Sequence, residues 1–302
     1  MGVQRRHLGN TGLDVGWLGL DPTPLTRQHE DLTLAIGELL DAGGNLVQVS
    51  GTDVVGVEPS LRGLLRDPGH RRDVCLNVRS AHTTRGDLLR HLDDILDQIG
   101  IDSLDLWTLG GWAERWDEIA TAASVALASG RAHYVCLSFP SAWQNVAVAS
   151  AVRWKPPGAD VAALATTYSL MDRRAEGDCL PAAHALGAGF IAGAPLAHGI
   201  LTGKYRHGTP PDSRGATETH GAEIRRILDG SRRHVMDGVA AAAEGLSTSP
   251  ANVSLAWVRD SPGVSAVVPS VRTIHQWRGL LGSDGVLLPH EIRSALDDVS
   301  TM

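Results

Sequence analysis

The chain has 302 residues, 43% hydrophobic and 20% charged, so it can bury a sizeable core as one large α/β domain or two small ones. Its formal net charge is −7 and its basic residues form no stripe, which argues against a nucleic-acid-binding protein. No apolar run approaches the ~20 residues that span a bilayer. The polar start of the chain lacks the apolar core of a secretory signal, so we expect a cytoplasmic protein that does not enter a membrane.

Short apolar runs bounded by Gly, Pro or Asp alternate with amphipathic stretches, and such runs are typical of strands covered on both faces. In chain order, the expected strands are a first one near Trp17–Leu20 and then Gly44–Val49, Asp73–Arg79, Leu104–Leu109, Tyr134–Ser138, Val161–Thr166, Gly189–Pro195 and Ser265–Pro269. Between these strands, helical spacing of apolar side chains predicts helices over Leu32–Leu40, Leu88–Ile99, Ser141–Trp154 and Pro250–Val258.

Repeated strand–helix units predict parallel strands, because a crossover helix returns the chain to the same edge. Eight such units in a chain of this size predict a closed (β/α)8 TIM barrel, with residues 1–302 forming a single domain. A doubly wound open sheet is the alternative. That fold would need a Gly-rich phosphate loop after its first strand, and neither G-x-G-x-x-G nor G-x-x-x-x-G-K-[ST] occurs.

The cysteines and histidines predict neither a disulfide framework nor a metal site. The three cysteines have no motif spacing and lie in apolar stretches, which favours burial in a reducing compartment. They are Cys75, Cys136 and Cys179. The thirteen histidines are scattered, without H-E-x-x-H or C-x-x-C spacing.

Several long motifs resemble those of the aldo-keto reductase family. They are H-L-G-N-T-G-L-D-V (His7–Val15), Y-S-L-M-D-R-R-A-E (Tyr168–Glu176), A-P-L-A-H-G-I-L-T-G-K-Y (Ala194–Tyr205), S-P-A-N-V-S-L-A-W-V (Ser249–Val258) and P-G-V-S-A-V-V-P-S-V-R-T (Pro262–Thr273). The resemblance covers nearly the whole chain. It implies a barrel whose bottom is closed by an N-terminal hairpin. It also implies NADPH-dependent carbonyl reduction, in which a Tyr donates the proton, a Lys–Asp pair tunes that Tyr and a His orients the substrate.

The four positions that hold the family's catalytic Asp, Tyr, Lys and His are all changed here. They fall, in that order, on Gln48, Asp53, Arg79 and Gly110. Asp53 cannot replace a phenol as proton donor at neutral pH unless its pKa of ~3.9 is raised by several units. Arg79 stays charged and cannot shuttle a proton. Because the four residues act as a unit, their loss leaves no acid coupled to hydride transfer.

The cofactor positions implied by the resemblance have changed as well. The family's carboxamide-binding Asn and Gln, its stacking aromatic and its adenine-end Glu–Asn pair fall on Phe139, Ala165, Gly193, Gly279 and Leu280. The donors that remain are Ser138, Lys204 and Arg272. The lost stacking and hydrogen bonds would each contribute about 1 kcal/mol or more, so we expect no tight binding of NADP.

The resemblance brings a remade pocket together at the barrel mouth. Its members are Gln48, Asp53, Arg79, Gly110, Trp112, Phe139 and His198. One interpretation is a binding site, in which Arg79 grips a carboxylate while Trp112 and Phe139 cover an apolar body. A second is a non-redox enzyme that uses Asp53 or a loop histidine as acid or base. A third leaves Asp53 and Arg79 as an ion pair that neutralises its own charge, with Trp112 packed in the core or a lid.

Composition adds an association with bacterial biosynthesis. The chain is rich in Ala, Gly, Arg and Val and poor in Lys, as in GC-rich bacterial genomes, where remodelled reductases serve specialised metabolism. We predict a degenerate aldo-keto reductase barrel without ordinary reductase activity. It would bind a small metabolite, serve a partner enzyme as accessory or gatekeeper, or do both, in a pathway such as antibiotic biosynthesis. The alternatives are a repurposed cyclase, dehydratase or isomerase, and a residual NADP-dependent oxidoreductase.

Overall fold

A computed structural model of the chain describes residues 2–25, 29–111, 115–155, 160–206, 208–211, 213–217, 221–222, 224–225, 228 and 232–301, apart from the side chains of His29, Asp53, Val55 and Arg214. Seven parallel strands form one sheet, and each pairs with the next in chain order. They are β3 (Leu46–Ser50), β4 (Cys75–Ser80), β5 (Leu104–Gly110), β6 (Ala132–Ser138), β7 (Ala163–Thr167), β8 (Gly189–Gly193) and β9 (Ala266–Val268).

The segment Leu18–Asp21 closes this sheet into a barrel. Its backbone forms parallel bridges with Val267 in the last strand and with Val47 in the first. The N–H of Leu20 donates to the Leu46 carbonyl at 2.9 Å. Eight parallel segments therefore surround the barrel interior. This confirms the predicted (β/α)8 architecture and its first strand near Trp17–Leu20, and excludes the open sheet.

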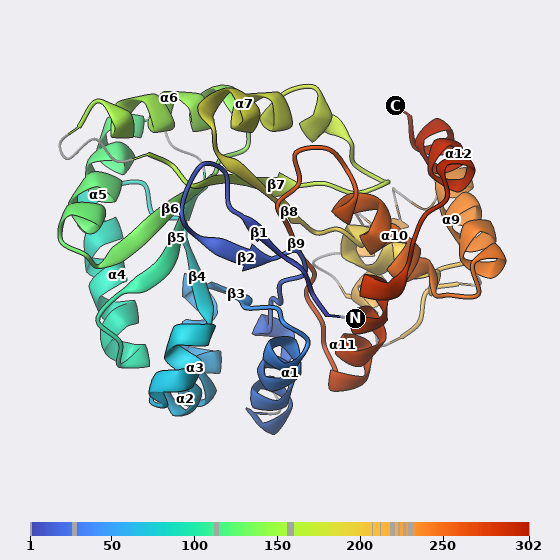
Figure 1. Cartoon of the computed structure of the whole chain (residues 1–302), viewed down its shortest axis with the longest axis horizontal. Coiled ribbons are helices and arrows are strands. Elements are labelled where there is room, and N and C mark those ends of the chain that lie inside the picture. The colour runs from blue at the N-terminus through green and yellow to red at the C-terminus, as the bar shows by residue number, and fades with distance from the viewer. Residues whose placement is uncertain are drawn as a thin grey trace.

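Helices surround the barrel as an outer layer (Figure 1). They are α1 (His29–Asp41), α2 (Val54–Leu65), α3 (Pro68–Asp73), α4 (Arg85–Ile99), α5 (Trp116–Ala128), α6 (Ala142–Arg153), α7 (Cys179–Leu186), α9 (Arg233–Gly245), α10 (Pro250–Arg259), α11 (Ile274–Leu281) and α12 (His290–Ser300). The four predicted helical segments are confirmed as α1, α4, α6 and α10. Helix α10 has Pro250 at its first position, and the Asn252 N–H donates to the Ser249 hydroxyl at 3.1 Å. None of the described helices is long and apolar enough to cross a membrane.

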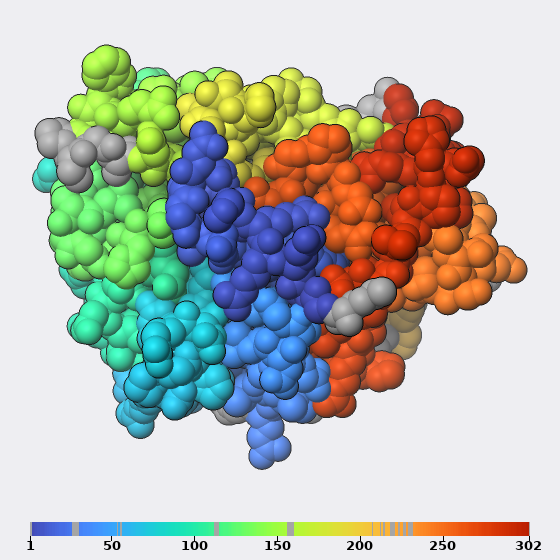
Figure 2. All heavy atoms as spheres, viewed as in Figure 1, coloured from blue at the N-terminus to red at the C-terminus, as the bar shows by residue number. Residues whose placement is uncertain are grey.

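The N-terminal hairpin covers one end of the barrel, where Figure 2 shows it in dark blue. It consists of the antiparallel strands β1 (Arg5–His7) and β2 (Asp14–Gly16). Its turn needs Gly9, which has φ +62° and lies so close to β8 that a Cβ would approach the Gly189 nitrogen at 2.5 Å. Leu8 and Val15 are fully buried against the barrel interior. The hairpin thus closes the amino ends of the strands, so any site must lie at their carboxyl ends.

Two hydrophobic cores result from this arrangement. The inner core joins hairpin side chains to inward-facing residues of the strands, and the larger outer core lies between the strands and the helices. All three cysteines are buried and unpaired, as predicted. Burial raises the pKa of the Cys136 thiol to about 12, so this inner-core thiol stays protonated and is no nucleophile at neutral pH.

Candidate functional site

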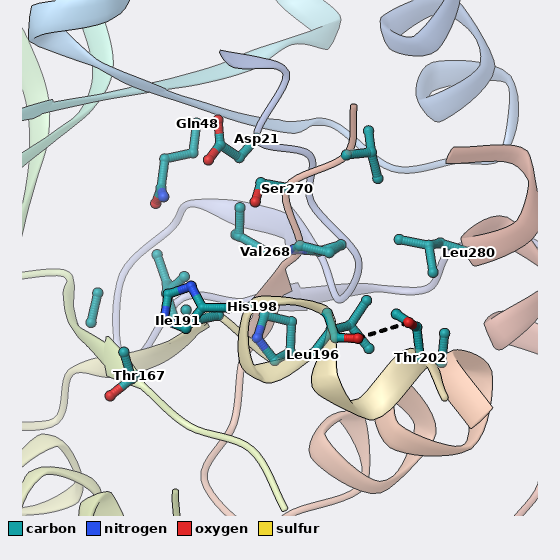
Figure 3. Close-up of a pocket in the computed structure, with 18 of the residues that line it drawn as sticks. Asp21, Gln48, Thr167, Ile191, Leu196, His198, Thr202, Val268, Ser270 and Leu280 are labelled. Carbon is teal, nitrogen blue, oxygen red and sulfur yellow. Dashed lines mark hydrogen bonds between the residues drawn. The ribbon is translucent and has the colours of Figure 1, made fainter. Parts of the chain in front are cut away.

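A cavity of about 1090 Å³ opens at the carboxyl ends of the strands. Its wall combines the ends of β3 to β5, the turn after β6 and the loops after β8 and β9. Figure 3 shows Gln48 and Asp21 entering it from one side and His198 from the loop after β8 on the other. Active sites of barrels of this type are built at this end, because the strand–helix loops converge there.

The cavity floor is a chain of neutral polar side chains across three neighbouring strands. The Thr108 hydroxyl donates to Asn77 Oδ1 at 2.7 Å, and Asn77 Nδ2 donates to Gln48 Oε1 at 3.1 Å. Thr108 and Asn77 are almost fully buried. Gln48 turns its amide nitrogen toward the cavity, and this nitrogen has no hydrogen-bond partner among the described residues. Gln48 therefore offers the cavity an amide donor and no negative charge.

Gly110 leaves no room for the side chain that its position holds in the family. It pairs with Ser138 across β5 and β6, and a Cβ on Gly110 would approach the Ser138 carbonyl oxygen at 2.5 Å. The Ser138 oxygen belongs to the backbone, so it cannot move away without a shift of the two strands. The backbone around Gly110 therefore excludes a side chain here, including the imidazole that the family resemblance implies at this position.

Arg79 lies at the end of β4, lines the cavity and is exposed. It forms no hydrogen bond or ion pair with any side chain that the structure describes. The Asp53 side chain lies outside the described part of the chain, so an Asp53–Arg79 pair stays a prediction. Its backbone ends the short turn η2 (Gly51–Asp53). Trp112 also lies outside the described residues.

Phe139 lines the cavity, but its side chain is buried in the outer core with an exposure of 2%. The backbone around it is fixed by a fully buried amide. Asn145 Oδ1 accepts the Phe139 N–H at 3.1 Å, and Asn145 Nδ2 donates to the Phe139 carbonyl at 3.3 Å. Phe139 therefore contributes a rigid wall to the cavity and little open stacking surface.

The loop after β8 brings His198 into the cavity in a strained backbone conformation. Ala194, Ala197 and His198 all have positive φ, between 46° and 57°. Non-glycine residues rarely adopt this region, and such strain collects at functional sites. The loop is held by the Thr202 hydroxyl, which donates to the Gly199 carbonyl at 2.7 Å (Figure 3).

The three predicted donors for a dinucleotide all line the cavity. Ser138 lies at the end of β6, whereas Lys204 and Arg272 are exposed and come from the loops after β8 and β9. Gln276, in the first turn of α11, accepts the Arg272 backbone N–H at 3.0 Å. The sequence interpretation did not single out Gln276, although it lies only four residues beyond Arg272.

The described lining residues make the cavity cationic. Asp21 is their only carboxylate, and it accepts the Thr23 N–H at 3.0 Å. Against it stand Arg79, Lys204 and Arg272. In a chain with a formal net charge of −7, such a cavity favours an anionic ligand over a cationic one.

A half-buried histidine supports the turn that carries position 53. Trp107 Nε1 donates to the Ser80 hydroxyl at 3.0 Å, and this hydroxyl lies 3.0 Å from His91 Nδ1. The indole N–H is only a donor, so the Ser80 oxygen accepts from it and keeps its own O–H available to donate to His91 Nδ1, and His91 also bonds the backbone of Gly51. Burial, and then the nearby His82, lower the pKa of His91, so the neutral ring is favoured.

Asn77, Thr108 and Asp21 are site residues that the sequence interpretation missed. A signal for Asn77 was present, since it lies two residues before Arg79 and must face the same side of its strand. A polar residue at an interior barrel position then calls for a partner on a neighbouring strand. Among the described residues, no group of three or more His, Cys, Asp or Glu could hold a metal ion.

Comparison with known proteins agrees with this architecture. The model of the aldo/keto reductase family matches residues 30–300. The uncharacterized oxidoreductase YrpG of Bacillus subtilis (strain 168) is 31% identical over 217 residues, which are 70% of this chain and 62% of that protein. L-glyceraldehyde 3-phosphate reductase of Escherichia coli (strain K12) is 30% identical over 189 residues, 60% of this chain and 53% of the reductase.

A probable voltage-gated potassium channel subunit beta of Oryza sativa subsp. japonica is 36% identical over 103 residues, 33% of this chain and 31% of that protein. The chain spans less than two thirds of the length of each of these three relatives. The family match covers most of the chain, and the barrel, the hairpin and the cavity at the carboxyl ends of the strands accompany it. The chain therefore belongs to the aldo/keto reductase family.

Proposed function

We propose that this family member does not carry out NADPH-dependent carbonyl reduction and instead binds an anionic metabolite as an accessory or gatekeeper to a partner enzyme of bacterial specialised metabolism. The observation that carries the proposal is the cavity floor. Gln48, Asn77 and Thr108 form a neutral hydrogen-bonded chain where the family places the charged partner of its proton donor. None of the three titrates near neutral pH, so none can supply the proton that carbonyl reduction needs.

The described residues of the groove do not fit the family's dinucleotide. Phe139 has its ring in the outer core and its backbone bonded to Asn145. Ala165, Gly193 and Leu280 line the cavity without a hydrogen-bonding or stacking side chain at the family's binding positions. Ser138, Lys204 and Arg272 remain as scattered polar groups.

A metabolite with a carboxylate and an apolar body suits the cavity better. Arg79, which has no described side-chain partner, would hold the carboxylate, and the Gln48 amide would donate to a ligand oxygen. Ile191 and Val268 supply apolar wall. A protein that resembles this chain over 103 residues is named a probable voltage-gated potassium channel subunit beta, and this name of a subunit supports an accessory role here.

A second candidate is a cyclase, dehydratase or isomerase that needs no hydride. The strained backbone of His198 favours it, because strain of this kind collects where a side chain must be aimed. His198 and Asp21 both line the cavity and would act as acid and base, respectively. Turnover of a metabolite by the isolated protein would favour this candidate over the accessory role.

Calorimetric titration with NADPH and with NADP tests the proposal. We expect no binding up to millimolar cofactor. Micromolar binding would contradict the inference that Phe139, Ala165 and Gly193 no longer hold the nicotinamide, and would make a cofactor-dependent role the leading hypothesis.

The positive half of the proposal is tested by a thermal-shift screen of carboxylate metabolites. Arg79→Ala should remove the shift that a hit produces and leave the melting temperature of the free protein nearly unchanged, because Arg79 bonds no described side chain. Arg66, exposed and outside the cavity lining, gives the matched control Arg66→Ala, which should keep the shift. A collapse in stability on Arg79→Ala would instead support a structural pair with Asp53.

A further inference from the structure

Helix α6 is apolar on its solvent side as well as on its barrel side. Val148 and Val152 are fully buried, but Trp143 is 57% exposed and Trp154, directly after the helix, is 87% exposed. Val146 lies between them and is exposed as well. A surface helix normally presents charged residues to water, whereas α6 contains a single charged residue near its end. Its outer face is defined here as Trp143, Val146, Ala147, Ser150 and Trp154.

The amino end of this face is a fixed aromatic projection. Trp116, at the start of α5, meets Trp143 edge to face with ring centroids 5.6 Å apart and planes at 90°. Helices α5 and α6 lie side by side in Figure 1, on the side of the barrel away from α9 and α12. Because Trp116 restrains it, Trp143 would lose little side-chain entropy on contact with a partner.

The carboxyl end of the same face holds a cavity of about 220 Å³, separate from the candidate functional site. Ser150, Arg153 and Trp154 form its α6 wall, and Val161 and Leu186 lie opposite. Trp143 and Trp154 are 11 residues apart, which is about three helical turns. The face therefore has a projection at one end and a recess at the other, with the small Ala147 and Ser150 between them.

We propose that this face pairs with a second copy of the chain, with the two α6 helices antiparallel about a two-fold axis. That arrangement places Trp143 of each copy over the recess beside the other copy's Trp154, and the small central residues allow close approach. A two-fold interface must be self-complementary, and a projection and a recess on one helix satisfy this requirement. The proposal is independent of the proposed function, because the face lies outside the cavity of the candidate functional site.

Area favours the same occupant, and the local charge permits it. Two chains that each carry a formal net charge of −7 repel one another overall, but α6 contains no acidic residue that would add to this repulsion at the interface. Asp160, beside the recess, is paired with Arg153 at 2.7 Å. A standard interface buries about 1,600 Å² in total, and a whole aromatic side chain buries about 150–250 Å², of which Trp143 and Trp154 still expose 57% and 87%. Trp143 and Trp154 from both copies would supply a large share of this area.

Sedimentation velocity over a range of concentrations tests the proposal, with circular dichroism as the check on folding. We expect a dimer for the native chain, and Val146→Glu should weaken it by about 100-fold because an unpaired charge would be buried. Trp143→Ala should weaken it as well. Leu287→Glu is the matched control, since Leu287 is 80% exposed on another part of the surface, and it should leave association unchanged.

Cross-linking gives a readout that does not depend on a disruptive variant. All native cysteines are buried, so Ser150→Cys adds an exposed thiol near the proposed axis. A short bismaleimide should join two copies of this variant, but not two copies of Leu287→Cys. A native chain that stays monomeric, a dimer that Val146→Glu does not weaken, or equal cross-linking of the two cysteine variants would overturn the proposal. A stable monomer would leave this face to a different protein.

Discussion

The floor of the cavity, at the ends of β3 to β5, is closely packed, whereas the groove beside the loops after β8 and β9 has open space at its glycines. On the floor, Thr108, Asn77 and Gln48 form a polar network, and Gly110 lies against the Ser138 carbonyl. In the groove, a Cβ on Gly193 would be in ordinary contact with the Thr166 carbonyl at 3.4 Å. A Cβ on Gly279 would meet nothing within 4 Å.

This difference in space decides which positions a single substitution can refill with a side chain. A binding side chain that is missing from a groove with open space can be restored by one substitution. A catalytic position over which the backbone has closed cannot be restored in this way, because two strands would have to separate. Restoring the four catalytic residue types together should therefore fail to restore reduction, because the closed backbone at Gly110 is an obstacle in addition to the cofactor contacts that the groove lacks.

The largest expected effect is at Gly110. Gly110→Ala should lower the free energy of unfolding by about 3 kcal/mol, because its Cβ would overlap the Ser138 carbonyl. Gly279→Ala, in α11 with open space around it, should raise that free energy by about 0.5 kcal/mol. Urea unfolding of both variants measures the contrast, and equal effects would contradict the claim that the floor alone is closed.

The next largest effect on the free energy of unfolding is expected at the polar floor of the cavity. Thr108→Val keeps the shape of the side chain but leaves the buried Asn77 Oδ1 without its donor, so we expect a loss of about 2 kcal/mol in the free energy of unfolding. Thr121→Val, whose hydroxyl bonds a carbonyl of its own helix near the surface, is the control and should change stability little. If both substitutions cost the same, the floor network would not be a specific feature of the site.

A smaller effect, a gain in affinity for NADPH, is expected from a substitution in the groove. Gly193→Tyr places a ring where the backbone leaves room, and stacking on a nicotinamide should add about 1 kcal/mol of affinity for NADPH, about five-fold, so that weak binding becomes detectable near millimolar cofactor where the native chain shows none. Gly193→Ala fills the same space without a ring and should add nothing. Fluorescence titration of NADPH compares the two variants. No gain for the tyrosine variant would mean that the groove is closed as firmly as the floor.

The last prediction concerns the pH dependence of stability that His91 should produce. His91 has a lowered pKa in the folded chain, while histidines of the unfolded chain titrate near ~6.5. The unfolded chain then binds more protons, so this part of the stability is present above about pH 6.5 and is lost as the pH falls toward the folded pKa. The charged groups that act on His91 are His82, which lowers its pKa further, and Asp94, which opposes this.

His82→Asn should therefore reduce the loss of stability on acidification, and His91→Asn should reduce it further while lowering stability at neutral pH. Melting temperatures across this pH range provide the test. His290→Asn, at an exposed position on α12, is the control. Identical pH profiles for the three variants would remove His91 from this role.

The fold could be predicted from the sequence because alternation of buried strands and amphipathic helices survives in every unit. Even the first barrel strand near Trp17 has a recognisable apolar pattern, although it is held by isolated bridges rather than a full ladder. The positions of Gln48, Arg79 and Gly110 follow from the family resemblance. The pairing of Thr108 with Asn77 and the closure of Gly110 by Ser138 could not be predicted, because both depend on the register of neighbouring strands, which one sequence does not specify.

The most direct test of the central claim is a single-turnover experiment with NADPH deuterated at its transferable position. The protein would be in excess over cofactor and a panel of aldehydes and ketones, and deuterium in the alcohol products would be measured by mass spectrometry. We predict no deuterated alcohol above the protein-free control, because the floor offers no proton donor. Stoichiometric transfer to any carbonyl would contradict this account and would identify an acid outside the four family positions.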